Sequence, residues 1–189
     1  MAKLLLTPEN QIQRLNQLLN FVDDLKTIGV ERLKNRPNEK SWNTIEVLEH
    51  LNIAYSLYAD NIHSTLEKLK DDNNGPWEYK PGFWNRFVIE GQRPKGSKRP
   101  FKMKTLKKFE PLLPNSLNEA TIEEVFNRFK NAHNQLKSFI VESRTKRIEH
   151  KKITSAIGPI VKFHLPEAFE FLICHAERHK IQIDEILGS

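Results

Sequence analysis

The sequence predicts an all-α fold, a four-helix bundle with a long basic loop between its second and third helices. Four long segments place apolar residues at steps of three and four, which is the spacing of one face of an α-helix. No two neighbouring segments show the alternation of paired strands, and helices with one apolar stripe bury it best against one another. A chain of 189 residues can build one complete core, so we expect a single domain over residues 1–189.

The first helix is expected over residues 8–35. Thr7 is a suitable N-cap, Pro8 fits the first helical turn, and Glu9 places an acid there. The pattern ends before Pro37, because proline cannot continue a helix. The apolar stripe consists of Ile12, Leu15, Leu18, Leu19, Val22, Leu25, Ile28 and Leu33.

The second helix is expected over residues 43–71. Asn43 and Glu46 have the spacing of a capping box, and Trp42 stands before them as a possible hydrophobic staple. Residues 71–76 are polar and end in Gly-Pro, which is a strong stop signal. The sequence therefore sets both ends of this helix.

Residues 73–116 form a long excursion that is rich in proline, glycine, lysine and aromatic residues. Only residues 83–89 suggest a short helix within it. A segment of this length without regular structure is unusual in a compact domain and is typical of functional or mobile loops. We expect the aromatic residues of its first half to pack onto the bundle; they are Trp77, Tyr79, Phe83, Trp84 and Phe87.

The positive charge of the protein is concentrated in the second half of this excursion. The net charge is +6, and residues 91–108 contain many lysines and arginines but no acid. The basic loop 91–108 has three interpretations: a solvated loop, a clamp for an anionic thiol or carboxylate substrate, or a weak nucleic-acid contact. We favour the solvated loop, because Phe101 is the only aromatic residue there and binding of single strands needs several stacking platforms.

The third helix is expected over residues 118–142 and the fourth over residues 166–187. A basic connector, residues 144–166, separates them and contains Gly158 and Pro159. The third helix has an apolar stripe of Ile122, Val125, Phe126, Phe129, Leu136, Phe139 and Ile140. The inner face of the fourth helix comprises Ala168, Leu172, His175, His179, Ile183 and Ile186.

Three histidines are candidates for one buried site. His175 and His179 are four residues apart, so they project from the same apolar face of the fourth helix. His50 shares a face of the second helix with Val47 and Ala54 and also points inward. Buried imidazoles are either hydrogen-bonded core residues or metal ligands. Residue chemistry leaves both readings open, and three imidazoles would suit zinc or nickel with coordination positions left free.

The remaining histidines are weaker candidates. His63 and His133 stand among polar residues and are expected to face solvent. His150 lies in the basic connector, and His164 precedes the fourth helix, near one end of the bundle. We expect none of these four to be a ligand.

Two segments together resemble the motifs of the DinB/YfiT-like superfamily. Residues 42–51, WNTIEVLEHL, resemble the motif that opens its second helix. Residues 175–183, HAERHKIQI, resemble its last-helix HxxxH motif followed by glutamine. The resemblance implies a four-helix bundle that holds a metal ion with His50, His175 and His179. The chain departs from the family pattern at Arg178, where a second histidine is common, and at residues 180–181, where Arg-Gly is common.

The resemblance implies a metal-dependent enzyme, since this superfamily includes thiol-dependent transferases and isomerases as well as metal-dependent hydrolases. The expected partners are a small-molecule substrate, for which a low-molecular-weight thiol is a candidate, and a second copy of the chain in a homodimer. A non-catalytic bundle that binds metal or a small ligand is the alternative, and weak nucleic-acid binding is a distant third.

Three polar residues near the histidines also have alternative readings. Glu46 could orient His50 or move protons, but we expect its capping role to dominate. Arg178 and Lys180 are expected on a solvated helix face rather than in contact with substrate.

The single cysteine, Cys174, excludes an intramolecular disulfide and a zinc site built on several thiolates. The sequence contains neither an apolar run of about 18 residues nor a secretory leader. We therefore expect a cytoplasmic protein.

Overall fold

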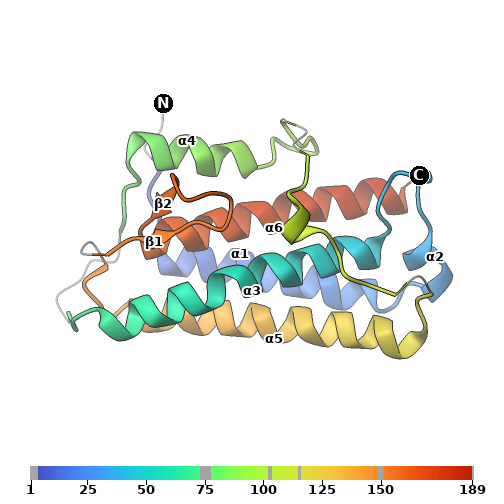
Figure 1. Cartoon of the computed structure of the whole chain (residues 1–189), viewed down its shortest axis with the longest axis horizontal. Coiled ribbons are helices and arrows are strands. Elements are labelled where there is room, and N and C mark those ends of the chain that lie inside the picture. Colours follow the sequence, from blue (N-terminus) through green and yellow to red (C-terminus); the bar gives the residue numbers. More distant parts are fainter. Residues whose placement is uncertain (1–3, 73–77, 102–103, 115, 149–150, 189) are drawn as a thin grey trace.

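The computed structural model describes residues 4–72, 78–101, 104–114, 116–148 and 151–188. Four long helices lie side by side as a bundle (Figure 1), so the predicted all-α fold is confirmed. They are α1 (Pro8–Leu25), α3 (Thr44–Lys68), α5 (Glu119–Ser143) and α6 (Leu165–Leu187). The shorter described elements are α2 (Val30–Lys34), α4 (Phe83–Gln92), a 3₁₀ helix (Lys107–Phe109) and the strands β1 (Ile153–Thr154) and β2 (Lys162–Phe163).

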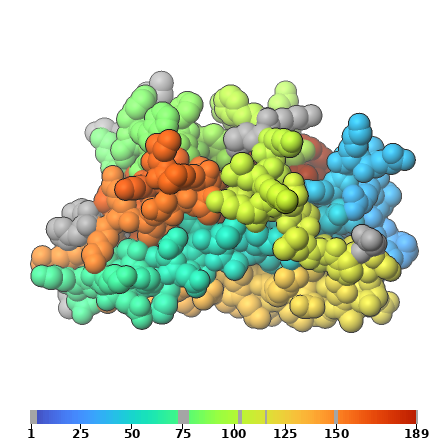
Figure 2. Space-filling view, in the orientation of Figure 1, coloured from blue at the N-terminus to red at the C-terminus, as the bar shows by residue number. Residues whose placement is uncertain are grey.

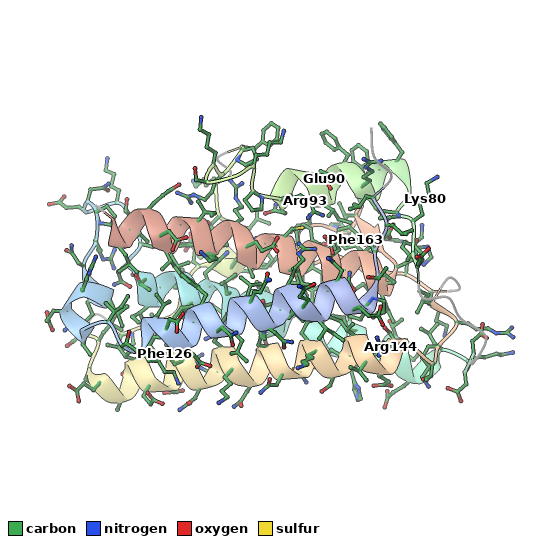
Figure 3. All side chains as sticks on the ribbon, turned by 180° about the vertical axis from the view of Figure 1, so that it is seen from behind. Lys80, Glu90, Arg93, Phe126, Arg144 and Phe163 are labelled. Carbon is green, nitrogen blue, oxygen red and sulfur yellow. The ribbon has the colours of Figure 1, made fainter. Side chains whose placement is uncertain are left out.

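The four long helices enclose one apolar core. Both α1 and α3 pack against α5 and α6, and Figure 3 shows α1 between α6 and α5 on the rear face. The largest fully buried apolar side chains include Leu15, Leu48, Phe129 and Phe169, one from each long helix. None of the described helices has both the length and the apolar character that a membrane span requires.

The predicted capping residues start the helices. The Thr7 hydroxyl accepts a hydrogen bond from the Asn10 backbone N–H at 3.2 Å. At α3, the Asn43 side chain accepts from the Glu46 N–H and the Glu46 carboxylate accepts from the Asn43 N–H, both at 2.9 Å. Each cap satisfies amide groups that the first helical turn would otherwise leave unpaired.

The prediction of one continuous helix over residues 8–35 was wrong, because the helix is interrupted in its last third. The first helix ends at Leu25, and α2 begins only at Val30. Gly29, with φ −56° and ψ 139°, lies outside the helical region and is the N-cap of α2. Leu25 and Leu33, on either side of the break, both enter the same core. The apolar spacing therefore continues through residues 26–29, and the sequence pattern could not reveal the break.

The first half of the excursion packs onto the bundle through a different face than predicted. Phe83, Trp84 and Phe87 are 88%, 57% and 65% exposed, so the expectation that they pack inward was wrong. The buried face of α4 carries Asn85, Ile89 and Gln92 instead. This helix packs mainly against α6. Tyr79 is half-buried, and Trp77 lies outside the described residues.

A polar contact explains the orientation of α4. The Asn85 amide donates to the Glu167 carboxylate at 2.6 Å and to the Lys162 carbonyl at 3.0 Å. Since Glu167 is fully buried at the start of α6, this hydrogen bond offsets part of the cost of burying it. The hydrogen bonds of Asn85 and the burial of Ile89 therefore both favour the side of α4 that faces the bundle.

The second half of the excursion is only partly the solvated loop that we favoured. Lys95, Lys98 and Lys104 are exposed, but Arg99 forms an ion pair with Glu185 on α6 and Phe109 is buried. Figure 2 shows residues of this segment, in yellow-green, lying over α3. The excursion thus covers one side of the bundle where α3 and α6 meet.

A short antiparallel hairpin was not expected in the connector before α6. Strand β1 pairs with β2, with Ile153 opposite Phe163. Both side chains are buried, whereas their neighbours Thr154 and Lys162 are exposed. Two-residue strands are too short to produce a recognisable alternation in the sequence.

A buried carboxylate, Glu170, joins three helices. It is 1% exposed, and one of its oxygens accepts from Arg14 of α1 and from Arg93 at the end of α4, both at 2.6 Å. Figure 3 shows Arg93 where α4 lies along α6. Burial alone raises the pKa of Glu170, but the two guanidinium groups outweigh it and lower the pKa. The carboxylate is therefore charged at neutral pH and holds α4 against α6.

Candidate metal centre

The structure brings His50, His175 and His179 into one cluster. One ring nitrogen of each residue lies within 4.8 Å of the others, and the Nε2 atoms of His50 and His175 are 3.0 Å apart. His50 comes from α3, and the other two come from successive turns of α6, which packs beside it. His50 and His179 are buried, and His175 is half-buried.

A carbonyl oxygen faces the second ring nitrogen of every histidine in the cluster. The Nδ1 atom of His50 lies 2.6 Å from the Phe109 backbone oxygen. The Nδ1 atoms of His175 and His179 lie 3.2 Å and 3.0 Å from the side-chain oxygens of Gln92 and Gln182. Carbonyl oxygens only accept hydrogen bonds, so each Nδ1 carries the proton and each Nε2 presents a lone pair.

These lone pairs fit a divalent metal ion. Two unprotonated nitrogens 3.0 Å apart repel each other unless a cation lies between them. Ligands about 2.0 to 2.1 Å from a tetrahedral zinc ion lie about 3.3 Å from one another, close to the observed separation. Metal-bound histidines usually donate their other N–H to a carbonyl or carboxylate, as all three do in this cluster.

Burial keeps the imidazoles neutral, the form that binds metal. It lowers the pKa of His50, although the hydrogen bond to Phe109 opposes the change. The pKa of His175 is lowered to about 3, mainly by burial and to a smaller extent by the positive charges that Arg178 and a protonated His50 carry. The pKa of His179 is also well below its usual value, from burial and then from the neighbouring histidines. Protons therefore do not compete with a cation here at neutral pH.

The three histidines line a cavity of about 720 Å³. Its lining combines polar and charged side chains with apolar ones, which include Trp42, whose ring centroid lies 5.1 Å from that of His50. The other apolar or aromatic lining residues are Ala54, Tyr58, Leu106, Phe109, Ile157, Phe171 and Leu172. A cavity of this size can hold a small molecule beside the histidines.

Sequence reasoning missed two contacts that orient the cluster. Gln92 and Phe109 belong to the excursion, more than forty residues from His50 and more than fifty from α6, and no local signal connects them with the histidines. Gln182 was part of the recognised motif, and its position three residues after His179 places it one helical turn away. The bundle thus supplies the three imidazoles, while the excursion supplies partners for two of them.

Arg178 has a different environment from the one predicted, so its assignment to a solvated face was wrong. The side chain is buried, and its guanidinium donates to the backbone oxygens of Pro100 and Phe101. The excursion covers this side of α6 and accepts both hydrogen bonds. Lys180, one turn from Asp184, forms an ion pair with it at the surface.

Glu46 has the capping role that we expected to dominate. Its carboxylate closes the capping box at the start of α3 and also pairs with Arg36. The Nδ1 atom of His50 contacts Phe109 rather than Glu46. The structure therefore gives Glu46 a structural contact at the helix start.

The other described histidines lie outside the cluster. His63 is exposed as predicted, but the same prediction for His133 was wrong, because this residue is 1% exposed and its Nε2 lies 2.6 Å from the Leu15 carbonyl oxygen. His133 lies on the buried stripe of α5 with Phe129 and Leu136, one turn away on either side. His164 is the N-cap of α6, and His150 lies outside the described residues.

Replacing Gln182 by alanine is expected to weaken zinc binding about 10- to 100-fold, because His179 loses the acceptor that fixes its ring. Competition with a chromophoric chelator measures the dissociation constant. Gln182→Glu keeps an oxygen at this position and should retain most of the affinity. The matched control is Gln17→Ala on the exposed face of α1. Equal affinities for wild type and Gln182→Ala would show that this contact does not support the metal site.

Comparison with known proteins identifies a family for this chain. The chain matches the DinB superfamily over residues 11–183, a range that contains His50, His175 and His179. The comparisons with curated proteins and with solved structures gave no match. Since the family match extends over most of the sequence and includes both motif segments, the chain belongs to the DinB superfamily.

Proposed function

We propose that this protein is a metal-dependent enzyme in which His50, His175 and His179 hold a divalent ion, zinc or nickel. The observation that carries the proposal is the convergence of three imidazole nitrogens on an open cavity, with every Nδ1 facing a carbonyl oxygen. Three protein ligands leave coordination positions for water or substrate, as in catalytic rather than structural sites. An ion held in this way lowers the pKa of a bound water or thiol and so supplies a nucleophile at neutral pH.

The thiol of the chain itself is unsuited to this role. Cys174 is fully buried, and burial raises the pKa of its thiol to about 12. Its sulfur also lies 3.5 Å from a Glu170 oxygen. A thiolate there would be both desolvated and beside a carboxylate. The nucleophile must therefore be water or a thiol that enters from solution.

The lining of the cavity favours thiol transfer over hydrolysis. Metal-dependent hydrolysis of the HExxH type uses a carboxylate to take a proton from the attacking water. No aspartate or glutamate is among the described residues that line this cavity. The Tyr58 hydroxyl is no substitute, because burial raises its pKa to about 12 and it is hydrogen-bonded to Ser155. A metal-bound water keeps a pKa near 7, whereas a metal-bound thiol is deprotonated outright, so a thiol needs such a base less than water does. We therefore favour a transferase that uses a low-molecular-weight thiol.

The proposal is tested with zinc-loaded and nickel-loaded protein, a panel of low-molecular-weight thiols and the electrophile 1-chloro-2,4-dinitrobenzene. Thiol-dependent turnover above the uncatalysed rate is expected, with loss of turnover after chelation and in His179→Ala. Nitrophenyl esters serve as the hydrolase arm of the same experiment. Stoichiometric metal without turnover in either arm would favour the alternative, a bundle that binds metal or a small ligand without catalysis.

Nucleic-acid binding through the basic loop has little support. Arg93 and Arg99 form ion pairs with glutamates of α6, which reduces the positive charge available to phosphates. Binding that depended on phosphate contacts would fall steeply as salt is raised.

A further inference from the structure

The charged residues around the cavity share one sign. Its lining includes a set of four cationic residues, which we call the cationic rim: Lys40, Arg99, Lys104 and Arg178. The chain contains 24 acidic residues, yet none is among the described lining residues. The rim is assembled from three separate parts of the chain, namely the link before α3, the excursion and α6. Its uniform sign is therefore a property of the folded site rather than of one basic stretch of sequence.

The four cations differ in how far the protein itself neutralises them. Arg99 forms an ion pair with Glu185, and Arg178 donates to two neutral backbone carbonyls and also interacts electrostatically with Glu185. Lys40 and Lys104 are exposed, and neither forms an ion pair with any described residue. These two ammonium groups are therefore available to an incoming ligand.

The remaining walls define the rest of the ligand. Trp42, Leu106 and Phe109 line the same cavity and offer apolar surface close to His50. Moving an apolar body from water to such walls lowers the free energy of binding. Placing an anionic group beside unpaired ammonium groups lowers it further. A ligand with both parts matches the cavity better than a neutral or cationic molecule of equal size.

We propose that this cavity selects small organic anions with an apolar body, and that Lys40 and Lys104 bind the anionic group. This inference rests on the proposed function, since it names the chemical class of the substrate or thiol that the histidine site would use. Lys40 and Lys104 act as specificity residues, and the carboxylate or another anion of the ligand lies at the rim.

Calorimetric titration with 6-phenylhexanoate and its neutral analogue 6-phenylhexanamide tests the proposal. We expect the carboxylate to bind zinc-loaded wild type at least about 10-fold more tightly than the amide, a difference that electrostatic pairing readily supplies. In the double variant Lys40→Gln, Lys104→Gln this preference should fall to about 2-fold or less. The matched control is Lys151→Gln, Lys152→Gln, which removes the same charge from two exposed lysines that do not line the cavity.

The same titrations on chelator-treated protein separate the rim from the metal site. Circular dichroism first shows that the chelated protein is folded. If the lysines bind the anion, the preference persists without metal and still disappears in the double variant, even if the protein proves not to be a metal enzyme. A preference that chelation abolishes and the lysine substitutions leave intact would overturn the proposal, because the carboxylate would then bind the metal. Equal binding of the two probes, or no binding of either, would overturn it as well.

Discussion

His179→Ala is expected to abolish stoichiometric binding of zinc or nickel. The substitution removes one of three imidazoles whose nitrogens lie within 4.8 Å of one another. Metal affinity should fall by more than about 100-fold. Removing a residue that only hydrogen-bonds to a metal ligand typically costs up to about 100-fold, and removing the ligand itself should cost more. Elemental analysis of untagged protein after dialysis measures the metal content. His50→Ala should have the same effect, since its imidazole comes from the other helix of the site.

The control for this experiment is His63→Ala, which removes an exposed histidine from the same helix as His50. This variant should retain wild-type metal content. Zinc at 100 times its dissociation constant should also stabilise the wild type by about 2.7 kcal/mol and leave His179→Ala unchanged. If the wild type carries no metal and neither ion raises its melting temperature, the three histidines are core residues and the enzyme proposal must be abandoned.

Glu170→Gln is expected to lower the free energy of unfolding by about 2 to 4 kcal/mol. The side chain keeps its shape but loses the charge that faces Arg14 and Arg93. Removing one partner of a buried ion pair typically costs about 3 to 5 kcal/mol, and the partial exposure of both arginines reduces this figure. Urea unfolding monitored by circular dichroism measures the difference. The matched control is Asp71→Asn, which breaks the ion pair between the exposed Asp71 and Lys146 and should cost far less.

The pH dependence of this difference distinguishes a charge effect from a packing effect. The folded state lowers the pKa of Glu170, so its stabilising contribution is fully present above the ordinary carboxyl pKa of 4.5. As the pH falls below that value toward the folded pKa, the contribution is lost. Wild type and Glu170→Gln should therefore differ by a constant amount from pH 7 to about pH 5 and converge in more acidic solution. A difference that is unchanged at low pH would mean that the charge of the carboxylate is not its source.

The sequence was sufficient for the features that depend on local periodicity. The stripes of the four long helices, the capping box at Asn43 and the inward positions of His175 and His179 all follow from residues within one or two turns. His50 could be grouped with them because it shares the buried face of α3 with Val47 and Ala54. A bundle places such faces together, so the candidate site could be proposed before the packing was known.

The features that the sequence did not predict depend on contacts between distant segments. The apolar spacing of the first helix continues unchanged across the break at Gly29. Phe83 and Trp84 resemble core residues in the sequence, and only the hydrogen bond between Asn85 and Glu167 shows that another face of α4 is buried. Arg178 and His133 looked solvent-facing because their neighbours in sequence are polar. Their partners are backbone carbonyls that no residue pattern identifies.

The contact between His50 and Phe109 has a consequence for how this site tolerates change. The acceptor is a main-chain oxygen, so no replacement of the Phe109 side chain can delete it. Its position depends on the path of the loop that runs from α4 to α5. The orientation of the His50 ring therefore depends less on an acceptor side chain in this loop than on where the loop places its backbone, so insertions and deletions should disturb it most. Loop length, more than loop composition, constrains how this part of the protein can evolve.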